Sequence, residues 1–215
     1  ITRCLVGSEM CIRDRDYSED FVAGDRENWP DETRAGEICI KRLVAGDRGH
    51  FGPFEHAQIM LNVGWFPHSV MQQARTHRVG VSFDVQSMRY TGERICRAAD
   101  GALDLEEVFY LRPVGEYRAR IGNKYTYTEE QRSIDLELCQ RSAERYRDLL
   151  RSGFSEEHAR GILPFDYRQH FIASFSLRAF LHFMDLRAKQ DAQLEIRQLC
   201  DLMWPHMVCL LYTSD

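Results

Sequence analysis

The segment AQIMLNVG, residues 57–64, carries the clearest secondary-structure signal in this chain. Ile59, Leu61 and Val63 occupy every second position, and this alternation predicts a half-buried β-strand. Pro67 suits the first position of a helix, which the pattern extends to about residue 78. Residues 79–92 hold too many turn and β-branched residues for a helix, so an extended loop is expected there.

The rest of the chain predicts long helices around that strand. The motif TEEQ, residues 128–131, is a capping box and predicts a helix over residues 129–152. Residues 171–186 are apolar nearly all round, which is typical of a buried helix. Other elements are expected at residues 30–46 (helix), 109–111 (strand) and 192–203 (helix). The pattern predicts a single α+β domain in which an antiparallel sheet packs with long helices.

Composition narrows the class of protein. The 215 residues are 44% hydrophobic and 28% charged, the balance of a globular domain. An apolar run long enough to span a membrane and a signal-peptide core are both missing, so a cytoplasmic protein is expected. The seven cysteines form no CxxC pair, which argues against a disulfide framework or a zinc ribbon. The net charge of −5 argues against a nucleic-acid polymer as partner.

Both ends of the chain look foreign to the rest. CLVGSEMCIRDR, residues 4–15, and CLLYTSD, residues 209–215, resemble translated read-through of a sequencing-library adapter. The expected organisation is therefore an artefactual or disordered extension over residues 1–15, the natural domain over residues 16–208, and an artefactual tail over residues 209–215.

The densest polar cluster follows the predicted helix after Pro67. Arg75, His77 and Arg78 end that helix, where basic side chains also complement the helix dipole. Ser87, Arg89 and Tyr90 then offer a hydroxyl, a guanidinium and a phenol within four residues, a set suited to phosphate and sugar. Of the 28 basic residues 25 are arginine, which binds phosphate in a planar fork; an arginine-rich genome would give the same bias.

The segment THRVGVSFDVQSMRYTG, residues 76–92, resembles the signature of the flavin-dependent thymidylate synthases, most closely that of their cyanobacterial-type members. The signature reads Arg-His-Arg, seven residues, Ser, and then Arg-Tyr. Further segments that resemble the family, in order, are GHFGPFEH (49–56), FPHSVMQQARTHR (66–78), EEHARGILPFDYR (156–168) and LRAKQDAQLEIRQL (186–199). An ordered set of motifs is more specific than one short motif.

The resemblance implies an activity and its co-substrates. It implies an enzyme that methylates dUMP to dTMP through bound FAD, with 5,10-methylenetetrahydrofolate as carbon donor and NADPH as reductant. It also implies a homotetramer whose active sites use residues from several subunits. A related flavin-dependent methylase that acts on another uracil nucleotide is the alternative within this class.

The resemblance also implies roles for particular residues. Arg187 would be the catalytic residue, stabilising charge on the uracil ring. The dUMP-binding residues would be Gln73, Ser87, Arg89, Arg160 and Arg187. The FAD-binding residues would be His50, Gly52, Glu55, Thr76, His77, Arg78, Ser176, Arg178 and His182. Without the family, Arg160 reads as a solvated helix cap and Arg187 as part of a structural ion pair.

The chain departs from the family pattern at the proposed flavin site. Thr76 replaces the first arginine of the signature, and eight residues, 79–86, stand where the pattern has seven. Ser176 and His182 stand where the family has asparagine. Thr76, Ser176 and His182 all belong to the FAD set rather than the dUMP set.

Two further classes compete with the enzyme hypothesis. One is a non-catalytic nucleotide- or RNA-binding module that uses the arginine cluster. The other is a metal hydrolase built on His50, Glu55, His56 and His77, whose spacing fits no helical metal motif, so no metal site is expected. Near the end of the chain, Glu195 is expected to face solvent or a subunit contact, and Met203 and Trp204 the core.

Overall fold

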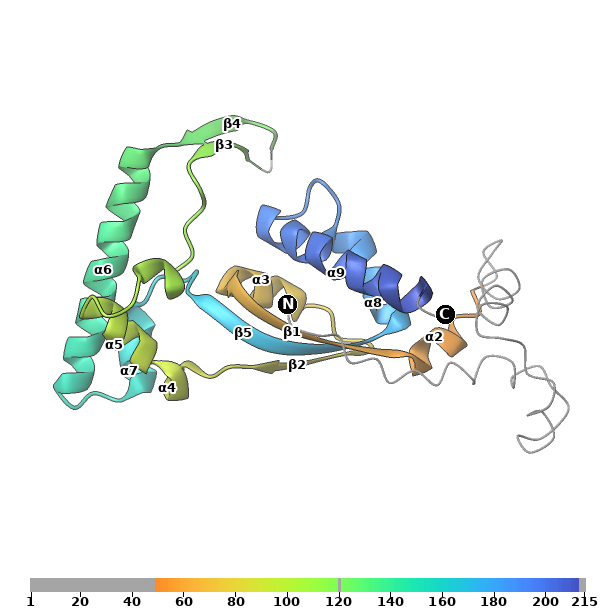
Figure 1. Ribbon diagram of the computed structural model, residues 1–215, viewed down its shortest axis with the longest axis horizontal. Coiled ribbons are helices and arrows are strands. Elements are labelled where there is room, and N and C mark those ends of the chain that lie inside the picture. The colour runs from red at the N-terminus through yellow and green to blue at the C-terminus, as the bar shows by residue number, and fades with distance from the viewer. Residues whose placement is uncertain (1–48, 120, 213–215) are drawn as a thin grey trace, which may run out of the picture. The chain divides into compact units, whose positions relative to one another are not determined.

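The computed structural model describes residues 49–119 and 121–212, without the side chains of residues 53 and 208–212. The helix expected over residues 30–46 and the extension over residues 1–15 lie outside this part. The elements in order are α2 (Gly52–His56), β1 (Gln58–Pro67), α3 (His68–Ala74), β2 (Val81–Val85), α4 (Met88–Thr91), α5 (Glu93–Ala99), η5 (Leu105–Glu107), β3 (Gly115–Arg118), β4 (Lys124–Tyr127), α6 (Glu129–Arg151), α7 (Glu156–Ala159), η6 (Arg160–Ile162), β5 (Arg168–Ser176), α8 (Leu177–Arg187) and α9 (Leu194–Tyr212), as labelled in Figure 1.

The main sheet is antiparallel, as the sequence predicted. Its strand order is β1-β5-β2. The amide of His68 donates to the Tyr167 carbonyl at one end of the β1–β5 pair, and that of Leu177 donates to the Ala57 carbonyl at the other. Residue numbers therefore rise along one strand while they fall along its neighbour, which makes β1 and β5 antiparallel. The amides of Gln86 and Ser176 donate to the carbonyls of His170 and Gly80 in the same sense, so β2 is also antiparallel to β5.

The chain divides by its internal contacts into two compact units. The first unit comprises Ile1–Asn62, His77–Phe83 and Ile172–Asp215, and the second comprises Val63–Thr76 and Asp84–Phe171. Each unit contains part of β1, β2 and β5, so the units are not two consecutive sequence domains. We describe each unit by itself.

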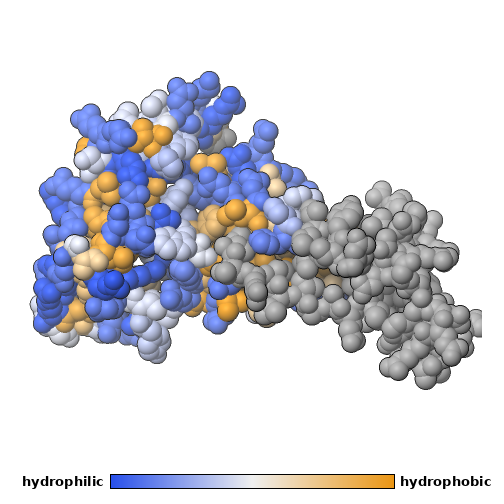
Figure 2. All heavy atoms as spheres, viewed as in Figure 1, coloured by the Kyte–Doolittle hydropathy of each residue, from blue (hydrophilic) through white to orange (hydrophobic). Residues whose placement is uncertain are grey.

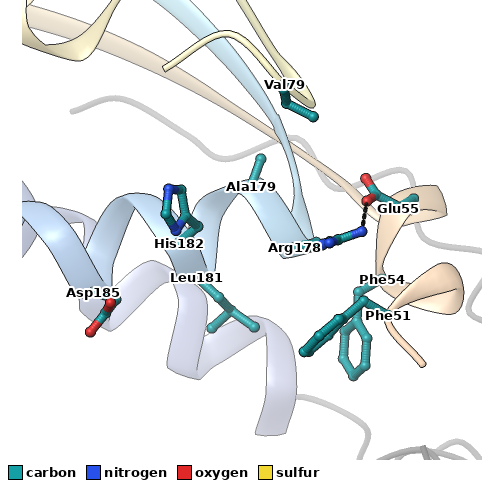
Figure 3. Close-up of a pocket in the computed structure, with 9 residues that line it drawn as sticks. All are labelled: Phe51, Phe54, Glu55, Val79, Arg178, Ala179, Leu181, His182 and Asp185. Atoms are coloured by element: carbon teal, nitrogen blue, oxygen red, sulfur yellow. Dashed lines mark hydrogen bonds and ion pairs between the residues drawn. The ribbon is translucent and has the colours of Figure 1, made fainter. Parts of the chain in front are cut away.

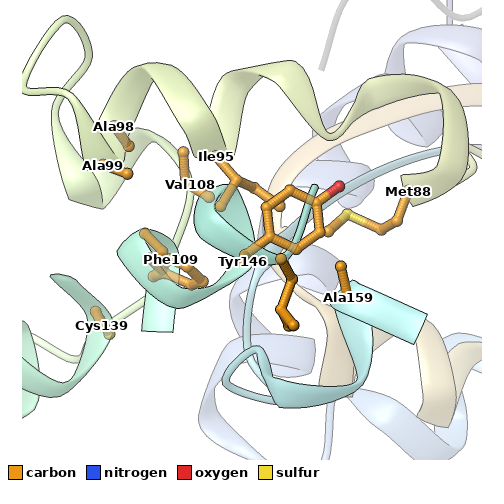
Figure 4. Close-up of a cluster of buried hydrophobic side chains, with 11 residues drawn as sticks. Met88, Ile95, Ala98, Ala99, Val108, Phe109, Cys139, Tyr146 and Ala159 are labelled. Carbon is orange, nitrogen blue, oxygen red and sulfur yellow. The ribbon is translucent and has the colours of Figure 1, made fainter. Parts of the chain in front are cut away.

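The core of the second unit forms around α6, which begins at the predicted capping box. The Thr128 hydroxyl accepts from the amide of Gln131, whose side chain accepts from the amide of Thr128. Helix α6 packs on α5, α7 and η5. The buried side chains of this core, most of them labelled in Figure 4, are Met88, Ile95, Ala98, Ala99, Val108, Phe109, Cys139, Ala143, Tyr146, Leu149 and Ala159.

The core of the first unit lies between the end of β5 and helices α8 and α9. The rings of Phe180 and Phe183 pack edge-on against Phe175, with centroids 5.8 and 5.4 Å away. Helix α9 covers α8 and buries Ile196, Leu199 and Met203. Such edge-to-face aromatic packing adds to the stabilisation from burial alone.

The described surface is mixed in character. Figure 2 shows hydrophilic residues over most of the described part of one face, with smaller hydrophobic patches among them. Among the hydrophobic side chains that reach the surface, Ile134 and Leu138 of α6 are each 53% exposed. In the described part of the chain, no helix combines the length and apolarity that a membrane crossing requires.

Two long expectations from the sequence are wrong in part. The expected loop over residues 79–92 contains β2 and the short helix α4. The helix expected over residues 171–186 begins only at Leu177, because residues up to Ser176 belong to β5. Phe171, Ala173 and Phe175 lie on the buried face of β5, and these apolar positions run directly into the apolar start of α8, so the two elements read as one helix.

Smaller corrections concern element ends and burial. Helix α3 ends at Ala74 rather than near residue 78, with Pro67 as its N-cap. Helix α9 begins at Leu194 and continues through Pro205 to Tyr212. Phe109 forms only an isolated bridge, with Tyr167. Met203 is buried as expected, but Trp204 is 50% exposed and Glu195 only 1% exposed, the reverse of the expectation for both.

The β3–β4 hairpin was not anticipated. Its antiparallel register pairs Gly115 with Tyr127 and Arg118 with Lys124. The rings of Tyr117 and Tyr125 stack across the two strands, and the Arg112 guanidinium lies over Tyr117. Cross-strand aromatic pairs of this kind stabilise a hairpin that has little buried apolar surface of its own.

Candidate functional site

A cavity of about 580 Å³ opens in the first unit between α2 and α8 (Figure 3). Three residues of the predicted flavin set line it: Glu55, Arg178 and His182. The full lining is Phe51, Phe54, Glu55, Val79, Arg178, Ala179, Leu181, His182 and Asp185. Aromatic and aliphatic walls with a few convergent polar groups are typical of a small-molecule site.

The carboxylate of Glu55 organises one end of the cavity. Arg178 Nη1 lies 2.8 Å from Glu55 Oε1, and the Ser176 hydroxyl donates to Glu55 Oε2 at 3.1 Å. The same hydroxyl accepts from the amide of Ala179 and so caps α8. The Arg178 guanidinium also lies 5.0 Å from the centre of the Phe51 ring. Glu55 therefore fixes Arg178 at the cavity rim.

Gly80 lets the segment His77–Phe83 approach the start of α8. Its φ of +68° is a left-handed conformation, and a Cβ there would lie 2.5 Å from the Ser176 hydroxyl. Its carbonyl accepts from the amide of Ser176 at 2.7 Å. Only glycine permits both the conformation and the close approach. This contact brings Val79 to the cavity wall.

His77 and Arg187 form a second polar contact in the first unit. Arg187 Nε donates to His77 Nε2 at 3.0 Å. The His77 ring also packs against Phe183 and His182, with centroids 4.9 and 5.8 Å away. Burial lowers the pKa of His77, and the charges of Arg187 and His182 lower it further. His77 is therefore a neutral acceptor that orients the Arg187 guanidinium.

The remaining flavin candidates are dispersed. His50, Gly52 and Arg78 are exposed residues of the first unit; Gly52 begins α2, and His50 lies two residues before it. Thr76 belongs to the second unit, where its hydroxyl and amide donate to the carbonyl of Gln73. The boundary between the units thus falls inside the Thr76–His77 dipeptide.

Most of the predicted dUMP residues belong to the second unit. Ser87 caps α4 by accepting from the amide of Arg89 at 3.4 Å. Arg89 Nη1 lies 2.6 Å from Glu157 Oε1 of α7, and the two side chains are 45% and 56% exposed. Arg160 begins η6 directly after α7, and α7 contacts both α4 and η6. The structure thus brings Ser87, Arg89 and Arg160 into one neighbourhood.

Gln73 and Arg187 complete the predicted dUMP set at other positions. Gln73 lies on α3, in the second unit. Arg187 is the last residue of α8, in the first unit. Arg187 therefore belongs with the flavin candidate His77, whereas the other four dUMP candidates share the second unit.

Sequence reasoning missed part of the cavity lining. Phe51 and Phe54 lie inside the motif GHFGPFEH, but they carry no polar group that would single them out. Leu181 and Asp185 follow Arg178 at helical spacing on α8. The helix predicted over residues 171–186 already placed both on the face of Arg178 and His182, so helical spacing could have identified them.

One alternative from the sequence was a metal site built on His50, Glu55, His56 and His77. Among residues 49–119 and 121–212, no group of three or more His, Cys, Asp or Glu is arranged to hold a metal ion.

The buried thiols in this part of the chain are poorly suited to nucleophilic chemistry. Burial raises the pKa of Cys139 to about 11 and that of Cys200 to about 12, so both are protonated near neutral pH.

Comparison with known sequences points to one family. The sequence profile of the family described as "Thymidylate synthase complementing protein" matches residues 4–210. A flavin-dependent thymidylate synthase from Haloarcula marismortui is 34% identical over 187 residues, which cover 85% of this chain and 72% of that protein. One from Halobacterium salinarum is 33% identical over 159 residues, which cover 72% of this chain and 64% of that protein.

Solved structures share the fold. Thymidylate synthase X from Helicobacter pylori, crystallised with FAD and dUMP, superposes with a TM-score of 0.68 at 15% identity and covers 94% of this chain and 92% of its own. A UMP/dUMP methylase, PolB, from Streptomyces cacaoi, bound with 5-Br dUMP, superposes with a TM-score of 0.71 at 21% identity and covers 97% and 91%.

Proposed function

The chain belongs to the family of flavin-dependent thymidylate synthases, and from this premise we propose that it methylates dUMP to dTMP. The observation that carries the proposal is the joining of the two predicted sets of residues in the first unit. There the flavin candidate His77 accepts a hydrogen bond from Arg187, the candidate for uracil activation. A flavin and a uracil ring would have to meet at such a contact.

The residues around the cavity fit FAD. The aromatic walls of Phe51 and Phe54 suit a planar ring system, and the cavity of about 580 Å³ has the size of a ligand site. Arg178 and His182 supply donors for an anionic cofactor. Bound FAD would supply the redox chemistry, taking reducing equivalents from NADPH for the methylation, with methylenetetrahydrofolate as carbon donor.

In the second unit, Arg89 and Arg160 would hold the dUMP phosphate. Both are exposed guanidinium groups near Ser87, whose hydroxyl is a further donor. Arginine binds phosphate through two parallel hydrogen bonds, which fixes orientation as well as affinity. Glu157 occupies Arg89 in the structure, so phosphate would replace this carboxylate.

Arg187 would act on the uracil ring. A guanidinium remains charged at every accessible pH, so it stabilises negative charge that develops on the ring during activation. His77 accepts from Arg187 Nε and so fixes the orientation of the guanidinium. Burial raises the pKa of the described thiols of Cys96, Cys139 and Cys200, which disfavours these three as nucleophiles.

The resemblance to the family also supports a proposal for the assembly of the protein. We propose a cytoplasmic homotetramer whose active sites combine residues from several subunits. The second candidate function is methylation of UMP, favoured by the similarity to PolB, a UMP/dUMP methylase. Product formation from UMP and from dUMP, measured side by side, separates the two.

The visible absorption spectrum of the purified protein tests the proposal. We expect flavin bands that bleach anaerobically with NADPH, and dTMP formation once dUMP and methylenetetrahydrofolate are added. His77→Ala should retain less FAD, because it removes the packing on Phe183 and the acceptor for Arg187. Arg141→Ala, at an exposed i,i+4 ion pair on α6, is the matched control and should retain FAD fully. A colourless wild-type protein that binds no added FAD would refute the proposal.

A further inference from the structure

A hydrogen-bonded chain of side chains runs through the second unit from α3 to the turn before α4. His68 Nδ1 lies 3.3 Å from Gln169 Oε1, and Gln169 Nε2 donates to the Gln86 carbonyl at 2.7 Å. At its other end, His68 Nε2 contacts the side-chain amide of Gln72, one turn along α3. Gln169 is only 1% exposed, so both ends of its amide depend on these partners.

The donors and acceptors in this hydrogen-bonded chain of side chains run in a single direction. A backbone carbonyl only accepts, so Gln86 fixes the Nε2 end of the Gln169 amide toward itself. The Oε1 end then faces His68, whose Nδ1 must donate. In a neutral imidazole the Nε2 is the acceptor, and it takes a hydrogen from Gln72. The neutral ring in its Nδ1–H form satisfies both contacts.

The surroundings hold the His68 ring in place and keep it neutral. Its ring stacks on the ring of Tyr167 and meets that of Phe165 edge-on, with centroids 4.8 and 5.3 Å away. Burial lowers the pKa of His68, and Arg75 lowers it further, against the opposing effects of the Gln169 hydrogen bond and Asp166. Asp166 also accepts from the amide of Ser69 and so secures the start of α3.

The two ends of this hydrogen-bonded chain of side chains adjoin the proposed dUMP residues. Gln72 precedes Gln73 on α3, and Gln86 precedes Ser87, which caps the helix that carries Arg89. We propose that His68 and Gln169 are positioning residues that hold α3 and the Ser87–Arg89 segment in the geometry required to bind dUMP. The inference rests on the proposed function of the site. Small displacements of binding groups are costly because the bonds to a ligand depend on distance and angle.

Three variants of the FAD-loaded enzyme test the role. His68→Phe keeps the stacking on Tyr167 but removes both hydrogen bonds, and Gln169→Leu removes the central link. His68→Asn places an amide nitrogen the same number of bonds from the backbone as Nδ1, so it keeps the donor to Gln169. We expect dUMP binding to weaken about tenfold in His68→Phe and Gln169→Leu, and less than about threefold in His68→Asn.

Three readouts distinguish positioning from general destabilisation. FAD content should stay at the wild-type level, because the flavin cavity belongs to the first unit. The KM for dUMP should rise while kcat at saturating dUMP changes less than about twofold. As the pH falls below 6.5, wild-type dUMP binding should weaken more than that of His68→Asn, whose side chain does not titrate. Titration of the dUMP phosphate affects both proteins equally.

The outcomes separate this inference from the proposed function. Wild-type dUMP affinity in both His68→Phe and Gln169→Leu would overturn the inference and leave the proposed function intact. Equal losses in His68→Asn and His68→Phe would overturn it as well, because the donor to Gln169 would then be irrelevant. Should His68→Phe fail to fold, the comparison of His68→Asn with Gln169→Leu decides. A wild-type protein that retains FAD but binds no dUMP would refute both.

Discussion

Replacing Gly92 with alanine should introduce a steric clash in the core of the second unit. Gly92 joins α4 to α5 with φ −70° and ψ −16°, a helical conformation that alanine adopts without strain. A Cβ at this position would nevertheless lie 2.0 Å from the Tyr146 hydroxyl oxygen and 3.0 Å from Cζ. Tyr146 is completely buried, so its ring has little room to move.

The magnitude follows from two opposing effects. Overpacking a core costs about 1–3 kcal/mol, whereas replacing glycine in a permitted conformation returns about 0.4–1 kcal/mol through the unfolded chain. We expect Gly92→Ala to lower the free energy of unfolding by about 1–2 kcal/mol. Because Gly92 ends the helix that carries Arg89, dUMP affinity should fall too.

Tyr146→Phe provides the rescue. The Tyr146 hydroxyl is buried and has no hydrogen-bond partner among the described residues. Removing an unpaired buried hydroxyl should leave stability unchanged or raise it by up to about 1 kcal/mol. In Gly92→Ala/Tyr146→Phe the closest clash is gone, so the double variant should be more stable than additivity predicts, by about 1 kcal/mol.

Urea unfolding of the wild type, both single variants and the double variant measures this coupling. Gly115→Ala is the matched control, since the nearest atom to its Cβ is 4.0 Å away, and it should change stability by less than about 0.5 kcal/mol. Additive effects of the two substitutions, or a loss above about 1 kcal/mol in Tyr146→Phe alone, would refute the argument from the clash.

Three further predictions concern the site. Arg160→Ala should mainly raise the KM for dUMP, whereas Arg187→Ala should lower kcat about 10²–10³-fold. Arg187→Lys should restore kcat only in part. Steady-state dTMP formation measures all three variants, and an unchanged kcat in Arg187→Ala would make Arg187 a binding group. Burial and the charges of Arg187 and His182 lower the pKa of His77, so its contribution to stability is present above pH 6.5 and is lost as the pH falls through the lowered pKa. Thermal unfolding from pH 7.5 to 5 should therefore show a smaller loss in His77→Asn than in wild type, and identical slopes would contradict this. Glu157→Gln should tighten dUMP binding, because Arg89 loses a competing carboxylate. Calorimetry at low salt measures the affinity, and a weaker or unchanged value would show that the phosphate does not bind at Arg89.

Several elements could be predicted from local sequence because their signals are local. The capping box at Thr128 predicted the start of α6, and the alternation of Ile59, Leu61 and Val63 predicted β1. The family motifs likewise predicted candidate residues, and the structure brings some of them together: Glu55, Arg178 and His182 at the cavity, and Ser87, Arg89 and Arg160 near α4 and α7. The other candidates lie elsewhere. The glycine at position 80 lies within such a motif, but the reason for it lies in its approach to Ser176.

Other features depended on neighbours distant in sequence. Strand β5 reads as a helix because Phe171, Ile172 and Ala173 are apolar in succession and the strand runs directly into the apolar residues of α8. Glu195 is buried although its charge predicts exposure. In each case tertiary burial outweighs local preference, which is a weak effect per residue.

The contacts that define the site were beyond any local pattern. Arg178 meets Glu55 across 123 residues, Arg187 meets His77 across 110, and His68 meets Gln169 across 101. Residue types and spacing determined which side chains were chemically capable of binding anions. Which of them pair was decided by the packing of α8 and of the β1–β5–β2 sheet, because a hydrogen bond depends on distance and angle that only the folded chain sets.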